Sequence, residues 1–368
     1  MDTITKAGIL LNAVKAPQKV FSRLCSDYDP EELWSRKSIW QELGLTARMS
    51  ERLTEFLFAD WAEREEERIE NFNARFITSK DIDYPAKLFD LNNPPVGLYV
   101  KGRVNLALPS VAIVGTRKCS EYARVVAENL GRALAQSGIT TISGGARGID
   151  SAGHRGTLAG GGVTIVVFGT GIDKTYPVEN RELFSRILER GAWVTEYPFG
   201  TGGSTWQFPE RDRIISGMAS RIVIAESPED GGAMHTARKG LKLHREVWSI
   251  PGRITDEVSR GTNILMREGS NVFIGINDFI KTVTKREQFS LFEDDEFGDK
   301  FDEKKEAPDL SGEAKIVYSV LQRKSGIMMD EIMSESGLDS GDVNIAISEL
   351  EAEGLISESG GRYSSVLL

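Results

Sequence analysis

The middle of the chain alternates short, continuously apolar runs with amphipathic segments of helical spacing. Runs that are apolar at every position are typical of strands buried on both faces of a sheet, and the helices between them cover such a sheet. The pattern therefore predicts an α/β protein with an extended Rossmann-like parallel sheet as its core, over residues 73–280. The predicted strands are residues 111–114, 139–142, 163–168, 193–195, 222–225 and 247–250, and the predicted helices are residues 122–136, 180–190 and 236–243.

A smaller segment precedes this core. Residues 1–72 predict a small helical, SAM-like domain, with helices over 7–14, from Pro30 onward, and over 50–71, where one long charged helix is expected. Residues 77–102 then pass through a proline turn into a strand, which joins the helical domain to the core.

Two further segments follow the core. Residues 281–309 are acidic and predict a disordered linker. Residues 310–368 predict three helices and a hairpin around Gly360, the pattern of a winged-helix domain. A winged helix that reads DNA carries basic residues on its third helix, so the acidic residues here predict a protein-interaction or regulatory module instead. The acidic residues are Asp342, Glu349, Glu351 and Glu353.

Composition places the protein among soluble globular proteins. Of the 368 residues 40% are hydrophobic and 27% are charged, and the length predicts two to three domains. No apolar run approaches the roughly 18 to 20 residues of a membrane span, and residues 1–15 show no secretory signal. Cys25 and Cys119 have no metal-type spacing and fit reduced thiols. We therefore expect a cytoplasmic protein without membrane contact and without a metal.

The net charge of −10 is unevenly distributed along the chain. Lys and Arg outnumber Asp and Glu by 20 to 18 in residues 108–280, whereas acidic residues are in excess by 10 to 6 in residues 281–309 and by 10 to 4 in residues 310–368. The core is thus the only long segment that does not repel a polyanion. Any nucleic acid is expected to bind there.

A glycine-rich loop follows the second predicted strand. It contains Gly144, Gly145 and Gly148 and precedes a helix expected to begin near Ser151. Glycine lets the backbone approach a ligand closely, and a helix N-terminus offers unpaired N–H groups and a partial positive charge. Arg147 adds a permanent cation. The loop predicts a phosphate or other anion site, with a tight turn that needs glycine for steric reasons alone as the alternative.

Basic residues also follow the other predicted strands. Because parallel strands end at the same edge of a sheet, the segments after them should meet along one rim. These segments include residues 115–117, 169–177 and 208–217. The cations expected to converge there are Arg117, Arg147, Lys174, Arg211 and Arg213.

Two kinds of ligand could bind at such a rim: a dinucleotide or single-stranded nucleic acid. A dinucleotide would require G-x-G-x-x-G after the first strand, but Gly115 is not followed by the later glycines, so we expect no nicotinamide or flavin cofactor. Single-stranded nucleic acid requires cations along its backbone and a ring on which a base stacks. Tyr176 is the candidate ring, with a half-buried loop anchor as its alternative role.

Several of these motifs together resemble the DNA-processing protein A family, also called DprA or Smf. The resemblance covers roughly residues 70–280, and its motifs occur in order. It implies a non-catalytic Rossmann-like protein that binds single-stranded DNA, forms a homodimer, and loads a RecA-type recombinase onto DNA coated by single-strand-binding protein, notably in the natural transformation of competent cells. The motifs are residues 113–117, 143–150, 171–177, 196–198, 208–217 and 250–252.

The resemblance also implies which residues contact the DNA phosphates. Two departures from the family pattern are Asp212, where asparagine is usual between the two arginines, and the 231–236 loop, which lacks the usual serine. Asp212 is expected to form a structural ion pair with its neighbours. The implied contacts are Gly115, Thr116, Arg117, Ser143, Gly144, Gly145, Ala146, Arg147, Gly148 and Lys174, with Arg211 and Arg213 in support.

An enzyme is the alternative from a different class. Rossmann-like nucleotide phosphoribohydrolases carry P-G-G-x-G-T-x-x-E, with the glutamate in the chemistry. The matching stretch, residues 228–239, ends in Arg238 and Lys239, so the glutamate position is basic. Cys119 follows the first loop and could be activated there, but neither it nor any histidine has a recognisable partner. We expect no catalysis.

A short peptide in the acidic segment suggests one more partner. Gln288, Phe289, Ser290, Leu291 and Phe292 resemble the peptides that bind bacterial DNA-handling proteins to the replication sliding clamp. The alternative is that the apolar residues of this peptide pack onto the core.

Overall fold

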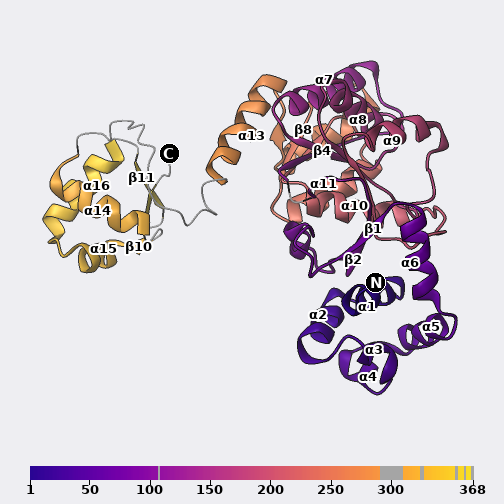
Figure 1. The fold of residues 1–368 in the computed structure, drawn as a ribbon. Coiled ribbons are helices and arrows are strands. Elements are labelled where there is room, and N and C mark those ends of the chain that lie inside the picture. The colour runs from indigo at the N-terminus through magenta and orange to yellow at the C-terminus, as the bar shows by residue number, and fades with distance from the viewer. Residues whose placement is uncertain (107, 291–309, 324–326, 353–354, 360–361, 366–368) are drawn as a thin grey trace. The chain divides into compact units, whose positions relative to one another are not determined.

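A computed structural model describes the chain except for residues 107, 291–309, 324–326, 353–354, 360–361 and 366–368. The chain folds into two compact units, Met1–Asp294 and Asp295–Leu368 (Figure 1). Across the residues described, no helix combines the length and the apolar character needed to cross a bilayer.

A nine-stranded sheet forms the centre of the first unit, in the order β1-β2-β6-β5-β4-β3-β7-β8-β9. The neighbours from β6 to β9 pair in parallel, and β1 and β2 extend the sheet in antiparallel fashion. The predicted parallel α/β core is confirmed. The strands are β1 (Arg75–Thr78), β2 (Gly97–Lys101), β3 (Ser110–Val114), β4 (Thr140–Ser143), β5 (Thr164–Val167), β6 (Ala192–Thr195), β7 (Arg221–Ile224), β8 (Glu246–Ser249) and β9 (Asn271–Val272).

Both faces of the sheet are buried, which explains the continuous apolar runs. On β3, Val111 and Ile113 point to one hydrophobic cluster, while Ala112 and Val114 point to another on the opposite face. The first face packs against α7 (Glu121–Gln136), α8 (Ile149–Ala159) and α13 (Ile276–Ser290), with α9 (Arg181–Ile187) beside α8. The second face packs against α10 (Gln207–Met218), α11 (Gly232–Lys242), α12 (Arg260–Arg267) and η1 (Ala86–Asp90). Two further short 3-10 turns are η2 (Val178–Asn180) and η3 (Glu257–Ser259).

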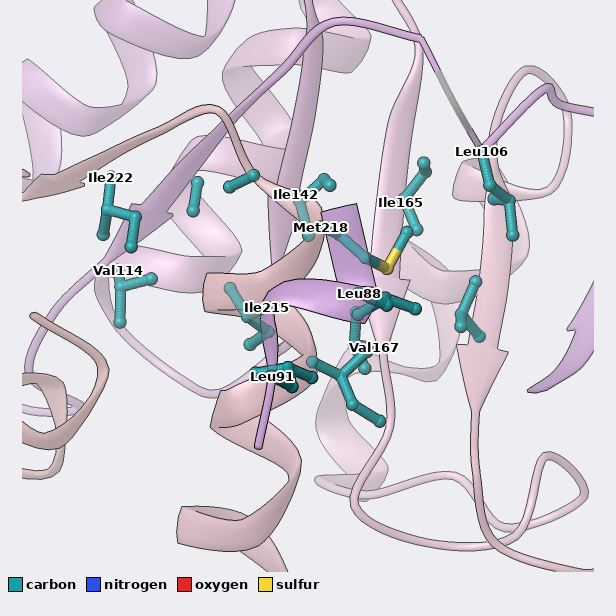
Figure 2. Close-up of a cluster of buried hydrophobic side chains, with 14 of the residues drawn as sticks. Leu88, Leu91, Leu106, Val114, Ile142, Ile165, Val167, Ile215, Met218 and Ile222 are labelled. Carbon is teal, nitrogen blue, oxygen red and sulfur yellow. The ribbon is translucent and has the colours of Figure 1, made fainter. Parts of the chain in front are cut away.

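The cluster on the second face joins the lead-in segment to the sheet. Figure 2 shows Leu88 of η1 and Leu91, the residue directly after η1, among Ile215 and Met218 of α10 and residues of the strands. A Cβ on Gly217 would lie 2.8 Å from Leu88 Cδ2, so the absence of a side chain there lets η1 pack closely on α10. This packing fixes the position of α10 on the second face of the sheet.

Six helices precede the sheet. They are α1 (Thr3–Ala13), α2 (Gln18–Asp27), α3 (Glu32–Ser35), α4 (Ile39–Leu43), α5 (Ala47–Phe58) and α6 (Trp61–Asn71). The single long helix predicted over residues 50–71 is wrong, because Asp60 adopts a left-handed conformation with φ of 46° and separates α5 from α6. The break brings Phe56 and Trp61 into a stacked pair with 4.6 Å between ring centroids.

These helices pack directly on the sheet region. Asn12 donates a hydrogen bond from Nδ2 to the Glu196 carbonyl at 2.7 Å. Glu65, which is fully buried on α6, accepts one from the Phe199 amide at 2.8 Å. The helical segment and the sheet therefore belong to one compact unit.

The segment after the core differs from the prediction at its start. α13 continues to Ser290, ten residues into the expected linker, because Phe279 and Val283 lie on one helical face and are buried against the sheet. The backbone of Gln288, Phe289 and Ser290 belongs to α13, but their side chains lie outside the described part of the structure, as do Leu291 and Phe292. The clamp-binding peptide stays a prediction.

In its described residues, the second unit contains three helices and a small antiparallel sheet in the order β10-β12-β11. A hydrophobic cluster that includes Val317, Ile332 and Leu350 joins the helices. The winged-helix assignment and its protein-interaction role stay predictions. The elements are α14 (Gly312–Arg323), β10 (Ile327–Met328), α15 (Met329–Ser336), α16 (Ser340–Ala352), β11 (Ile356–Ser359) and β12 (Arg362–Ser365).

Candidate nucleic-acid interface

The glycine loop, residues 144–148, connects β4 to α8 in a conformation that requires glycine. Gly145 and Gly148 have φ values of +67° and +74°, a region that other residues rarely adopt. A Cβ on Gly148 would lie 2.4 Å from the Thr116 carbonyl oxygen. The glycine loop and the loop after β3 therefore pack directly against each other. The helix begins at Ile149, two residues earlier than predicted.

Arg211 packs against the glycine loop and holds it through hydrogen bonds to the backbone. Its side chain is only 6% exposed, and it donates hydrogen bonds to the carbonyls of Gly144, at 2.8 Å, and Val167. Its Nε lies 3.1 Å from Asp212 Oδ1, so the structural ion pair expected for Asp212 is present. A Cβ on Gly144 would lie 2.5 Å from Arg211 Nη2, which explains the glycine there. The guanidinium thus ties the ends of β4 and β5 together.

Arg213 points away from Arg211, so the expected convergence of all five cations is wrong. The segment after β6 forms α10, which the sequence analysis did not predict, and residues two apart in a helix point to nearly opposite sides. Arg213 forms an ion pair with Glu196 and donates a hydrogen bond to the Asn93 carbonyl at 2.9 Å. Pro209 masked the helix in the sequence, although proline is tolerated in a first turn.

A small open cavity lies where the loops after β3, β4 and β5 meet α10. Its volume is about 50 Å³, against roughly 300 to 1,000 Å³ for sites that enclose a small molecule. The cavity is therefore too small to enclose a small molecule, and it forms a shallow hollow at the edge of the sheet. We call it the rim site, and it is lined by Arg117, Gly144, Ala146, Arg147, Tyr176, Pro177, Phe208 and Arg211.

Two aromatic rings form one side of the rim site. Tyr176 and Phe208 lie with 5.2 Å between ring centroids and 33° between ring planes, and Tyr176 is 46% exposed. The Arg117 guanidinium lies 5.5 Å from the centre of the Phe208 ring. The sequence analysis named only Tyr176 as a stacking candidate. The position of Phe208 directly before Pro209 and the arginines was the available signal for the second ring.

Two exposed cations on these loops form ion pairs with neighbouring carboxylates: Arg147, which lines the rim site, and Lys174, which does not. Arg147 forms an ion pair with Glu179, and both side chains are at least half exposed. Lys174 Nζ lies 3.5 Å from Asp173 Oδ2 and is also about half exposed, on the loop before Tyr176. Exposed pairs of this kind contribute little stability, so a phosphate can replace either carboxylate at low cost.

Other predicted contact residues position the loops through hydrogen bonds. Ser143 is buried, and its hydroxyl donates to the Ile113 carbonyl at 2.6 Å, inside the sheet. The Thr116 amide donates to the Glu226 carbonyl at 2.8 Å, and the Ala146 amide donates to Asp150 Oδ2 at 3.2 Å. A Cβ on Gly115 would lie 2.5 Å from an Ile149 side-chain carbon, so the first loop also packs closely on α8.

Two titratable groups are buried under the glycine loop. Burial raises the pKa of Asp150 to about 6 from its ordinary 3.8, while the positive charge of Arg211 opposes the rise. Burial also lowers the pKa of His154 to about 3, and its Nδ1 lies 2.7 Å from the Thr164 hydroxyl. Asp150 is thus the group under the loop whose charge changes near neutral pH.

Replacing Asp150 by Asn is expected to remove a pH dependence of stability between about pH 4 and pH 6. The folded state holds the proton more tightly than the unfolded state, so the free energy of unfolding of the wild type falls as pH rises through this window. The rise of the Asp150 pKa from 3.8 to about 6 corresponds to about 3 kcal/mol, which is the largest gain in the free energy of unfolding expected for Asp150→Asn relative to wild type at neutral pH. Urea titrations across the window measure the difference. A difference in the free energy of unfolding between the two proteins that stays constant with pH would contradict the raised pKa of Asp150.

The fold and the rim site define a class of protein. The chain is an α/β protein with an open, mostly parallel sheet. The edge of this sheet presents a glycine loop, exposed cations and a pair of aromatic rings, features that are typical of polyanion-binding proteins. A family model described as DNA recombination-mediator protein A matches residues 75–284. The chain belongs to this family.

Individual relatives agree with the family match. The Smf protein of Synechocystis is 32% identical, with 79% of this chain and 80% of that protein covered. The X-ray structure of DNA processing protein A from Streptococcus pneumoniae matches with a TM-score of 0.65 and 29% identity over 76% of this chain and 95% of that one. The protein from Helicobacter pylori, whose structure is described as showing a unique single-stranded DNA binding mode, matches with a TM-score of 0.53 and 28% identity over 58% of this chain and 97% of that one.

Proposed function

We propose that this protein binds single-stranded DNA at the rim site and acts as a non-catalytic recombination mediator. The observation that carries the proposal is the rim site itself, which Arg117 and Arg147 line together with the paired rings of Tyr176 and Phe208. Cations that follow a phosphate backbone and rings that accept bases are the two requirements of single-strand binding. The single-stranded DNA binding described for the Helicobacter pylori relative supports the proposal.

The mediator role goes beyond DNA binding. By its family resemblance we propose that the protein, as a homodimer, loads a RecA-type recombinase onto DNA covered by single-strand-binding protein during natural transformation. The excess of acidic residues in 281–309 and 310–368 disfavours DNA binding by these segments and leaves the core as the DNA-binding part.

A nucleotide phosphoribohydrolase is disfavoured by the same geometry. The rim site is too small to enclose a nucleotide, and the position of the catalytic glutamate is basic. Arg238 there pairs with Glu268 at 3.1 Å, and Lys239 donates to the Pro209 carbonyl. His154 is fully buried and contacts Thr164. These side chains therefore have structural partners in place of catalytic ones.

Recombinase loading and oligonucleotide length test the proposal together. The protein should accelerate RecA-type filament formation on single-stranded DNA coated by single-strand-binding protein, measured as the recombinase's DNA-dependent ATPase. Affinity should rise with oligonucleotide length, since a longer strand covers more of the rim. Binding that is independent of length, together with hydrolysis of a nucleoside monophosphate, would support the enzyme and contradict the mediator.

A further inference from the structure

A second basic and aromatic surface lies between the N-terminal helices and the sheet edge. Two adjoining open cavities, of about 360 and 450 Å³, occur where α1 and α5 face the loop of residues 201–207. Lys15, Arg52 and Trp206 line both cavities. We call the pair the helical groove. Neither cavity is part of the rim site.

The charge of the helical groove is positive. Lys15, Arg48 and Arg52 line the first cavity, and none of its lining residues is acidic. Arg52 donates a hydrogen bond to the Ala13 carbonyl at 3.2 Å, which holds its guanidinium at the groove wall. The nearby acid is Glu210, 3.3 Å from Lys15 Nζ, in a pair whose two side chains are 48% and 35% exposed. Such a pair is easily exchanged for a phosphate.

Trp206 gives the groove its aromatic surface. It is 55% exposed, whereas the other five tryptophans are buried or half-buried. Lys15 Nζ lies 4.2 Å from the Trp206 ring centre. A cation beside an aromatic ring repeats the arrangement of Arg117 and the half-buried Phe208 at the rim site. An exposed indole of this kind offers a stacking surface to a base.

The groove and the rim site lie on either side of one loop. Trp206 and Phe208 are two residues apart at the start of α10, and one belongs to each surface. Gly203 lines the groove, and a Cβ on it would lie 3.4 Å from the Phe208 ring. The 201–207 loop therefore separates the two surfaces by little more than its own backbone.

We propose that a single strand too long for the rim site continues into the helical groove. Its phosphates would contact Lys15, Arg48 and Arg52, and one base would stack on Trp206. This inference rests on the proposed binding of single-stranded DNA at the rim site. It gives the helical segment a direct part in DNA binding and predicts a longer binding footprint than the sheet edge alone provides.

Short and long oligonucleotides distinguish the groove from the rim. Fluorescence anisotropy with labelled dT6 and dT20 compares wild type with Arg48→Ala/Arg52→Ala. The variant should bind dT20 about tenfold more weakly, with a salt slope smaller by about 1.4, and should bind dT6 as wild type does. The matched control is Arg36→Ala/Lys37→Ala, which removes two exposed cations from the same helical segment outside the groove. The control should bind both oligonucleotides as wild type does.

Tryptophan fluorescence provides an independent readout. Binding of dT20 should quench wild-type emission, and Trp206→Phe, which preserves an aromatic ring, should lose most of that quenching while folding normally by circular dichroism. Equal dT20 affinity in wild type and the Arg48/Arg52 variant, or unchanged quenching in Trp206→Phe, would overturn the inference alone. Failure of the wild type to bind dT6 and dT20 would overturn the proposed function as well. If an acidic peptide quenches the wild-type tryptophan emission and dT20 does not, the groove binds a protein partner and the inference is overturned.

Discussion

Replacing Arg117 and Lys174 together by alanine is expected to weaken binding of dT20 about 100-fold. Arg117 lies at the rim site and Lys174 on the loop that carries Tyr176, and both can donate charge-assisted hydrogen bonds to phosphates. Loss of two such contacts should also reduce the salt slope of binding by about 1.4. Fluorescence-anisotropy titrations at several salt concentrations measure both quantities.

A matched control removes two exposed cations from the opposite edge of the sheet. Lys242 and Arg267 lie at the C-terminal ends of α11 and α12, each before a strand begins, and both are exposed. Lys242→Ala/Arg267→Ala changes the net charge by the same amount as the rim variant and should leave dT20 affinity within about twofold of wild type. An equal loss in both variants would show that binding depends on overall charge and not on the rim site.

Replacing Arg211 by alanine is expected to lower the free energy of unfolding by about 3–5 kcal/mol. The guanidinium is buried, so its removal leaves the Gly144 and Val167 carbonyls without these hydrogen bonds, leaves Asp212 without its ion-pair partner, and removes the positive charge that lowers the pKa of the buried Asp150. Urea unfolding measures the loss. Arg211→Lys keeps the charge but not the forked donor set, and should recover part of the stability.

The same variants separate a structural role of Arg211 from a direct phosphate contact. If Arg211 acts by holding the glycine loop, Arg211→Lys should bind DNA more weakly with an unchanged salt slope. In Arg211→Ala, which removes the charge, a salt slope smaller by about 0.7 together with a free energy of unfolding within about 1 kcal/mol of wild type would instead identify Arg211 as a phosphate ligand.

The central sheet could be predicted from the sequence because its strands are buried on both faces. Val111 and Ile113 pack on one side and Ala112 and Val114 on the other, so the hydrophobic run has no polar interruption. Once the strands are parallel, the loops after β3, β4 and β5 must lie at one edge. The meeting of Arg117, the glycine loop and Tyr176 follows from that topology.

The positions of Arg211 and Arg213 could not be predicted, because they depend on a helix that the hydrophobic pattern does not indicate. The helix α10 begins with few apolar residues and contains Pro209, so its periodicity was weak. Without that helix, Arg211 and Arg213 appeared equivalent, although one is buried under the glycine loop and the other pairs with Glu196. The helix break at Asp60 depends on a single left-handed residue, for which the sequence around it gives no glycine signal.

Photo-crosslinking tests most directly whether single-stranded DNA binds at the rim site. A dT6 oligonucleotide with one 5-iodouracil at its centre, irradiated in complex with the 368-residue chain, should form adducts with Tyr176 or Phe208 that mass spectrometry of tryptic peptides identifies. Excess unlabelled dT6 should abolish these adducts, and Arg117→Ala/Lys174→Ala should reduce them strongly. Adducts confined to residues 310–368, or adducts in the core that the double substitution leaves unchanged, would contradict binding at the rim site.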